Sequence, residues 1–233
     1  MVERETSWNH IKSSAYVCLD VGVPFKYYID SHSIFRFVER RDSFYFKYRL
    51  NQEGIDPQWK QVLKDLKIDF TYALSPQAKG KVERPYRWLQ DHLVRTCARE
   101  NIRDIKQARE ILRKEINHYN YHQVHSTTGE IPSLRFEKAL KENKSLFRPY
   151  KTPPPYQSTK DIFCIRIERT TDAYRRISVD NLLFKIPINP HERIQLRLVP
   201  NEKTGLTEIR FWHKNNLVLT QNVKNSELRR VHF

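Results

Sequence analysis

The chain has 233 residues, of which 39% are hydrophobic and 30% charged, and its formal net charge is +15. This length predicts one or two globular domains, and the charge favours a polyanionic partner, namely DNA, RNA or an acidic membrane surface. The 5 glycines form no GxGxxG or GxxxxGK motif, which argues against a glycine-loop nucleotide binder, and no apolar run approaches the roughly 18 residues that a membrane span needs.

The cysteines and the N-terminal residues indicate where such a protein resides. Cys18, Cys97 and Cys164 are scattered, and no two of them form a CxxC pair. Sparse, unpaired cysteines are typical of reduced thiols inside cells, and the first residues lack the shape of a signal peptide. We therefore expect a cytoplasmic protein without membrane contact.

The first predicted element is a helix over residues 6–20, where apolar side chains recur at helical spacing. Gly22 and Pro24 end this pattern. Residues 25–29 are aromatic and β-branched and predict a strand that leads into Asp30. Ligands of α/β sheets bind at the carboxyl ends of strands, which makes Asp30 a candidate site residue. A lone Asp at such a place is also typical of a turn or a helix N-cap.

The next stretch, residues 35–55, interleaves aromatic with basic side chains. This composition suits base stacking with phosphate binding, and it equally suits an ordinary β-hairpin with one buried face. Residues 57–66 predict a short helix with Pro57 near its first position. Residues 70–74 predict another strand.

Residues 75–85, Ser-Pro-Gln-Ala-Lys-Gly-Lys-Val-Glu-Arg-Pro, are the centre of the predicted site. We expect a glycine-containing loop here, followed by a helix over residues 82–101 with Glu83 in its first turn, where the helix dipole favours a carboxylate. Three flanking cations are placed to hold a phosphate backbone: Lys79, Lys81 and Arg84. The alternative is a surface loop followed by an ordinary helix-starting Glu.

Two further helices are predicted, over residues 104–121 and 132–142. His118, His122 and His125 lie near their junction. No cysteine or acid lies at the spacing of a zinc site, so we expect these histidines to cap and pack the helices.

Residues 147–160 contain four prolines and predict a stiff, extended linker between residues 1–146 and residues 161–233. Beyond the linker, 13 Lys or Arg accompany 8 Asp or Glu, so positive charge lies on both sides of it. Short strands separated by turn signals are predicted over residues 162–169, 176–179, 182–186, 194–199, 207–212 and 217–219. Their regular spacing predicts a small closed or nearly closed β-barrel.

The motif Pro76-Gln77-x-x-Gly80-x-x-Glu83-Arg84 resembles the surroundings of the third acidic residue in integrase-type DDE transposases of bacterial insertion sequences. These enzymes belong to the retroviral integrase superfamily and have an RNase H-like catalytic domain. Tyr119-Asn120, His125 and Gly129-x-x-Pro132 resemble the tail of that domain, and residues 25–35 resemble the strand that ends in its second acidic residue. The proline-rich linker and the strands that follow resemble the family's C-terminal DNA-binding domain. Lys79 stands where the family usually has Asn.

The resemblance implies metal-dependent cleavage and transfer of DNA strands in transposition, integration and recombination. Asp30 and Glu83 would be two of three carboxylates that hold paired Mg²⁺ or Mn²⁺ ions, which stabilise the attacking and leaving oxygens of a phosphoryl displacement. Four cations would hold phosphates near this site: Lys79, Lys81, Arg84 and Arg87. The partners would be transposon ends and target DNA, in a cytoplasmic, nucleoid-associated protein of a bacterial mobile element.

The first of the three carboxylates has no counterpart before Asp30, because Asp20 falls at a predicted helix end. The expected fold is therefore α/β, a partial RNase H-like domain that lacks its first strands (an N-terminal truncation), followed by a small all-β barrel. We expect DNA binding without cutting or joining by this chain alone, and a homo-oligomer or a full-length transposase as protein partner. The alternatives are a non-catalytic DNA-binding regulator of a full-length transposase, and an RNA-binding barrel with an unrelated helical domain.

Overall fold

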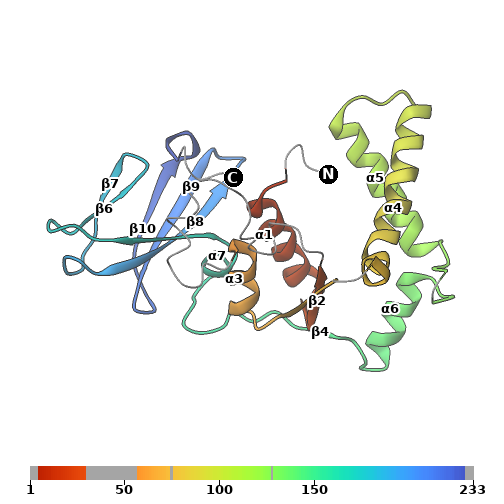
Figure 1. The fold of residues 1–233 in the computed structure, drawn as a ribbon, viewed down its shortest axis with the longest axis horizontal. Coiled ribbons are helices and arrows are strands. Elements are labelled where there is room, and N and C mark those ends of the chain that lie inside the picture. The colour runs from red at the N-terminus through yellow and green to blue at the C-terminus, as the bar shows by residue number, and fades with distance from the viewer. Residues whose placement is uncertain (1–4, 30–56, 74–75, 127, 229–233) are drawn as a thin grey trace. The chain divides into compact units, whose positions relative to one another are not determined.

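A computed structural model describes residues 5–29, 57–73, 76–126 and 128–228 (Figure 1). They form two compact units, each built from separate stretches of the chain. Unit 1 contains Pro24–Ser31 and Phe70–Arg148, and unit 2 contains Arg4–Val23, His32–Asp69 and Pro149–Phe233, in each case as far as these are described. Asp30 and residues 35–55 lie outside the described residues.

The sequence predicts two helical regions that are observed in unit 2, over residues 6–20 and 57–66. Helix α1 (Ser7–Tyr16) is capped by the Thr6 hydroxyl, which accepts a hydrogen bond from the Asn9 N–H at 3.2 Å, and a π-helical turn, η1 (Val17–Val21), continues it to Gly22. Helix α3 (Gln58–Asp65) follows Pro57. The Trp59 indole donates to the Ser14 hydroxyl at 2.8 Å, so buried polar atoms join the two helices.

The larger part of unit 2 consists of antiparallel strands. Four of them form one sheet in the order β10-β9-β8-β5: β5 (Ile165–Thr170), β8 (Arg193–Asn201), β9 (Leu206–His213) and β10 (Asn216–Lys224). A separate hairpin pairs β6 (Arg176–Val179) with β7 (Leu182–Lys185). Each of these six strands overlaps a strand predicted from the sequence.

The register of the sheet places fully buried apolar side chains of β8 and β9 opposite one another. Leu196 lies opposite Phe211, and Leu198 lies opposite Ile209. All four are fully buried, with 0% exposure. Because alternate residues of a strand face the same side, this register gives the sheet one continuous apolar face that forms the core of the unit.

The predicted first strand of this region is wrong at its start. Residues 159–162 form a short helix, α7 (Thr159–Ile162), and β5 begins only at Ile165. Ser158 and Asp161 form a capping box, in which each side chain satisfies a backbone N–H of the first turn. The apolar residues from Ile162 onward have the pattern of a strand, but the capping box stabilises a helical turn that includes Ile162.

The described part of unit 1 contains three helices and most of two short two-stranded sheets. Strand β2 (Lys26–Ile29) pairs with β3 (Asp69–Tyr72), and β1 (Val23–Pro24) pairs with β4 (Phe147–Arg148). Strands β1 and β3 each begin with a residue assigned to unit 2. The helices are α4 (Pro76–Arg99), α5 (Ile105–Tyr121) and α6 (Pro132–Lys141). Helices α4 and α5 lie side by side and form a helical hairpin (Figure 1).

The turn between α5 and α6 explains the Gly129-x-x-Pro132 motif. Gly129 has a φ of +69°, a conformation that glycine adopts without the steric cost that a side chain brings. Its N–H donates to the His125 carbonyl at 2.8 Å. Pro132 then starts α6, where its fixed φ suits the first helical turn.

The described part of unit 1 buries few apolar side chains. Among the buried hydrophobic residues, only Ile29, Ala73 and Ile111 belong to it. Several large apolar side chains of its helices and their connections are exposed instead: Tyr86, Val94, Tyr121, Val124, Leu134, Leu140 and Leu146. Within the described ranges, no helix combines the length and the apolar character needed to cross a bilayer.

Candidate nucleic-acid interface

Helix α4 begins six residues before the predicted start at Val82 and carries the central motif within its first turns. The predicted loop is wrong because Pro76 starts the helix, a place where proline's fixed φ and absent N–H are tolerated. Gly80 lies inside the helix and has no positive φ. Glu83 therefore lies about two turns from the helix start, and the first turn contains no acidic residue. The helix dipole acts within the first turn and does not stabilise the Glu83 carboxylate.

Glu83, Arg84 and Arg87 form one exposed cluster on α4. Residues three and four apart on a helix are neighbours, so both Glu83 and Arg84 lie next to Arg87. Lys79 and Lys81 belong to the same helix, one turn or less before this cluster. Pro85 lies in the helix interior and provides no N–H for the helical hydrogen bond to the residue 81 carbonyl. Of the predicted site residues, the structure thus brings together Glu83, Arg84 and Arg87.

The described residues do not form a metal site of the expected kind. Of the two acids that the resemblance assigns, Glu83 is described and exposed, whereas Asp30 lies outside the described ranges. In those ranges, no three His, Cys, Asp or Glu side chains come close enough to bind one ion. A two-metal site needs several carboxylates around each ion, so no catalytic step follows from the described residues.

A column of stacked rings occupies the interface between α4 and α5, and sequence reasoning missed it. The Trp88 ring stacks on His92 with centroids 3.9 Å apart and on His118 with centroids 6.2 Å apart, at interplanar angles of 23° and 12°. His118 stacks in turn on His122, with centroids 5.7 Å apart. The available signal was two i,i+4 ring pairs, one on the helix predicted over residues 82–101 and one at the end of the helix predicted over residues 104–121. The stacking agrees with the packing role expected of His118 and His122.

Glu115, Thr96 and Tyr119 make further contacts around this ring column. The Glu115 carboxylate lies 3.3 Å from the His92 Nδ1 and accepts a hydrogen bond from the Thr96 hydroxyl, also at 3.3 Å. Tyr119 contacts Trp88 with ring centroids 4.9 Å apart, and burial raises the pKa of its phenol. Trp88 and His92 are half-buried, whereas His118 and His122 are exposed. The column is therefore partly open to solvent.

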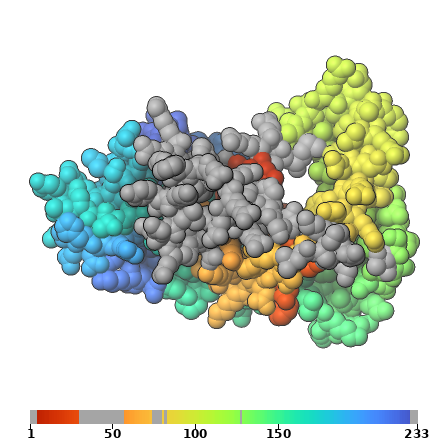
Figure 2. Space-filling view, in the orientation of Figure 1, coloured from red at the N-terminus to blue at the C-terminus, as the bar shows by residue number. Residues whose placement is uncertain are grey.

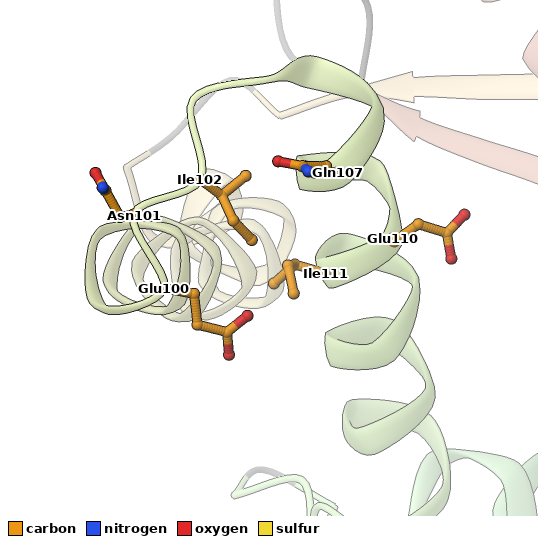
Figure 3. Close-up of a pocket in the computed structure, with 6 residues that line it drawn as sticks. All are labelled: Glu100, Asn101, Ile102, Gln107, Glu110 and Ile111. Atoms are coloured by element: carbon orange, nitrogen blue, oxygen red, sulfur yellow. The ribbon is translucent and has the colours of Figure 1, made fainter.

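The surface that α4 and α5 present is drawn in yellow and yellow-green in Figure 2. At the turn between the two helices, six residues line an open depression (Figure 3): Glu100, Asn101, Ile102, Gln107, Glu110 and Ile111. Ile102 and Ile111 face one another across it, and its two charged residues are acidic. A depression with two carboxylates repels phosphate, so we do not count it as part of the interface.

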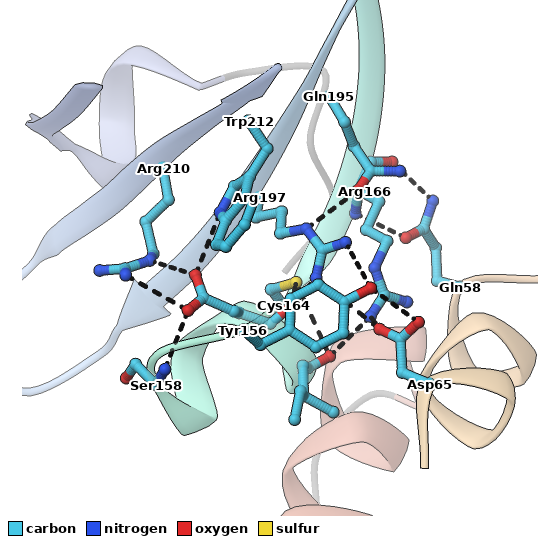
Figure 4. A network of polar contacts seen from close by, with 12 residues as sticks. Gln58, Asp65, Tyr156, Ser158, Cys164, Arg166, Gln195, Arg197, Arg210 and Trp212 are labelled. Carbon is cyan, nitrogen blue, oxygen red and sulfur yellow. Dashed lines mark hydrogen bonds and ion pairs between the residues drawn. The ribbon is translucent and has the colours of Figure 1, made fainter. Parts of the chain in front are cut away.

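Unit 2 contains a buried polar network that no motif suggested (Figure 4). The Asp161 carboxylate is fully buried and accepts hydrogen bonds from the Arg210 Nε at 2.6 Å and the Trp212 indole at 3.1 Å. Arg166 donates to Asp65 at 2.6 Å, and the Arg197 guanidinium lies 4.4 Å from the Tyr156 ring centroid. These contacts hold α3, α7 and strands β5, β8 and β9 together, which is a structural role.

No protein-family profile matches the sequence. The chain is similar to a protein of Sinorhizobium fredii (strain NBRC 101917 / NGR234) described as "Putative transposase y4bF", with 26% identity over 179 residues. The aligned part covers 77% of this chain and 34% of that protein, so the chain spans about a third of the length of its relative. This distant similarity supports a relationship to transposases.

Proposed function

We propose that this chain is part of an integrase-type DDE transposase and that it binds DNA through α4. The observation that carries the proposal is the exposed Arg84 and Arg87 beside Glu83, of which Glu83 and Arg84 belong to the motif that resembles the family's third acidic region. The distant similarity to a transposase and the net charge of +15 support it. In this proposal the chain comprises part of an RNase H-like domain and a small DNA-binding β-barrel.

The proposed mode of binding is electrostatic. Arg84 and Arg87 project from one face of α4, and Lys79 and Lys81 belong to the same helix. Arginine and lysine neutralise phosphates and release counterions, which gives affinity without selecting a base sequence. Binding through this face should therefore fall steeply as salt rises and depend little on duplex sequence.

Catalysis stays a property of the complete enzyme in this proposal. Asp30 and Glu83 would contribute two of the carboxylates that bind Mg²⁺ or Mn²⁺ in the family, and the sequence pattern before Asp30 offers no clear counterpart of the third. When bound, paired metal ions stabilise the oxygens of phosphoryl transfer. The chain by itself would bind DNA without cutting or joining it, a property shared by the second candidate, a non-catalytic regulator of a full-length transposase.

Fluorescence anisotropy of a labelled duplex, measured over a series of salt concentrations, tests the DNA-binding part. The logarithm of the association constant should fall linearly with the logarithm of salt, by about 0.9 per phosphate contact. Arg84→Gln with Arg87→Gln should weaken binding to every duplex sequence and make this slope shallower by about 0.9 for each phosphate that the protein no longer neutralises.

Arg113→Gln is a matched control, because Arg113 is also an exposed arginine of unit 1, on α5, and is ion-paired with Glu110 at 3.0 Å. This variant should leave the slope unchanged. A wild-type affinity that does not vary with salt, or a double variant that matches the wild type, would contradict binding through α4.

A further inference from the structure

The ring column of Trp88, His92, His118 and His122 differs from an ordinary helical interface. At the other end of the same hairpin, Ile102 and Ile111 provide aliphatic contacts. Around Trp88 the helices use flat rings, and His118 and His122 remain exposed although they belong to the interface. Exposed flat rings offer a surface on which a further planar group can stack, and every nucleobase has such a face.

Positive charge adjoins this column. Arg84 lies four residues before Trp88 on α4, so these two side chains are neighbours on the helix, and Arg87 lies next to Arg84, three residues further along the helix. Both arginines are exposed. Of the nearby acids, Asp91 pairs with Arg95 at 2.9 Å and Glu115 lies 3.3 Å from His92 within the column, whereas Glu83 is exposed next to Arg87. Aromatic faces next to exposed cations are the combination with which proteins bind single-stranded nucleic acid.

We propose that the ring column stacks an unpaired base of single-stranded DNA while Arg84 and Arg87 hold the adjoining phosphates. In an intact duplex each base is covered by its neighbours, so a ring can stack on a base only where the strand is single or the base is extruded. The inference rests on the proposed DNA binding and narrows the DNA to strands with unpaired bases, such as a frayed or cleaved end.

The chain contains its own reporter for this contact. Trp8, Trp59 and Trp212 are buried, with exposures of 5%, 3% and 4%, whereas Trp88 is half-buried. Of the four tryptophans, Trp88 is thus the least buried, and its ring is part of the column that stacks on His92 and His118. A single-stranded thymidine oligonucleotide should quench the emission of the wild-type protein, and the Trp88→Leu variant should lose this quenching.

The decisive experiment compares two labelled single strands of equal length, one with thymine bases and one with abasic sites, by fluorescence anisotropy. Both strands carry the same phosphates, so the difference between their affinities reports the contribution of the bases. The wild-type protein should bind the thymine strand about 5-fold to about 150-fold more tightly, the range that one stacked base provides. Trp88→Leu should reduce this ratio to about one, and Trp88→Phe, which keeps a flat ring, should retain most of it.

Tyr86→Leu is the matched control, because Tyr86 is an aromatic residue of the same helix that is 69% exposed and outside the ring column. It should leave the ratio unchanged, and circular dichroism should show equal helicity in all variants. Equal binding of thymine and abasic strands by the wild-type protein would overturn the stacking inference. If the protein then still binds duplex DNA with a steep salt dependence, the proposed function stands; if it binds neither strand nor duplex, the proposed function fails as well.

Discussion

Replacing the buried carboxylate of Asp161 by an amide, Asp161→Asn, should destabilise unit 2 strongly. One carboxylate oxygen accepts from the Arg210 Nε and the Trp212 indole. The other accepts from the backbone N–H groups of Gln157 at 3.1 Å and Ser158 at 3.0 Å and from the Arg210 Nη2 at 3.4 Å. An asparagine amide has a single oxygen. Whichever way it turns, its NH₂ group faces donors, and one set of donors loses its acceptor.

The size of the effect follows from burial. Removing one partner of a buried ion pair costs about 3–5 kcal/mol, because the remaining charge stays desolvated. Arg210 keeps a second acidic partner, Glu208, at 2.8 Å, and the Arg210 side chain is 11% exposed. Because the arginine would be neither unpaired nor fully desolvated, the lower end of this range applies. We expect a loss of about 3 kcal/mol, a large part of the roughly 5–15 kcal/mol that stabilises a typical domain.

Urea unfolding followed by circular dichroism measures this loss as a lower midpoint at an unchanged slope. Glu202→Gln is the control, because Glu202 pairs with Lys12 in the same unit but both side chains are exposed. Such a pair contributes at most about 1 kcal/mol. If Asp161→Asn and Glu202→Gln shift the midpoint equally, the buried network does not stabilise the unit and the reasoning is wrong.

Three further predictions concern acid stability and backbone conformation. Burial raises the pKa of Glu208, but hydrogen bonds from Lys160 and Arg210 outweigh it and hold the pKa below its ordinary value of 4.5. The free energy of unfolding should therefore fall as pH drops below about 4.5, and Glu208→Gln should flatten that dependence in urea titrations at several pH values. Gly129→Ala should lower stability by about 1 kcal/mol, because alanine disfavours the observed φ of +69°. Gly80→Ala should raise stability by about 0.5–1 kcal/mol, because Gly80 lies inside a helix and its new Cβ meets no described atom closer than the Arg84 Nε at 4.0 Å. Thermal denaturation of the two glycine variants should therefore show a lower midpoint for Gly129→Ala and a higher one for Gly80→Ala.

The sequence predicted most helices and strands, because each has a local pattern of apolar residues and end signals. The strand over residues 182–186, for example, is observed as Leu182–Lys185, and the helix over residues 132–142 as Pro132–Lys141. The predicted start of α4 was wrong because two local sequence signals conflicted. Gly80 suggested a loop, whereas Pro76 is an equally good first residue of a helix, and the helix includes both.

Contacts between distant residues escaped the sequence reasoning. The partners of Asp161 in the buried network lie 49 and 51 residues further along the chain, so nothing near Asp161 indicates that its charge is buried. The ring column has the same origin, since Trp88 and His118 meet only because α4 and α5 form a hairpin. Local patterns predict elements, but contacts of this kind depend on how the elements pack.

The candidate site stays a prediction, of which the structure describes only a part. Glu83 and Arg84 were selected from the motif and Arg87 from the resemblance, and the structure places all three on one exposed stretch of α4. The prediction that the helix dipole stabilises the Glu83 carboxylate was wrong, because this prediction depended on where the helix begins. The assignment of Asp30 as a metal ligand stays a prediction.

The central claim is that this chain binds DNA but does not by itself cut or join it. A strand-transfer assay with labelled transposon-end DNA, target DNA and Mg²⁺ or Mn²⁺, run beside a duplex-binding measurement, tests it most directly. The account predicts a salt-sensitive protein–DNA complex and no nicked or joined product. Metal-dependent product that disappears in both Asp30→Ala and Glu83→Ala would contradict it, because the chain would then contain a working catalytic site that requires both carboxylates.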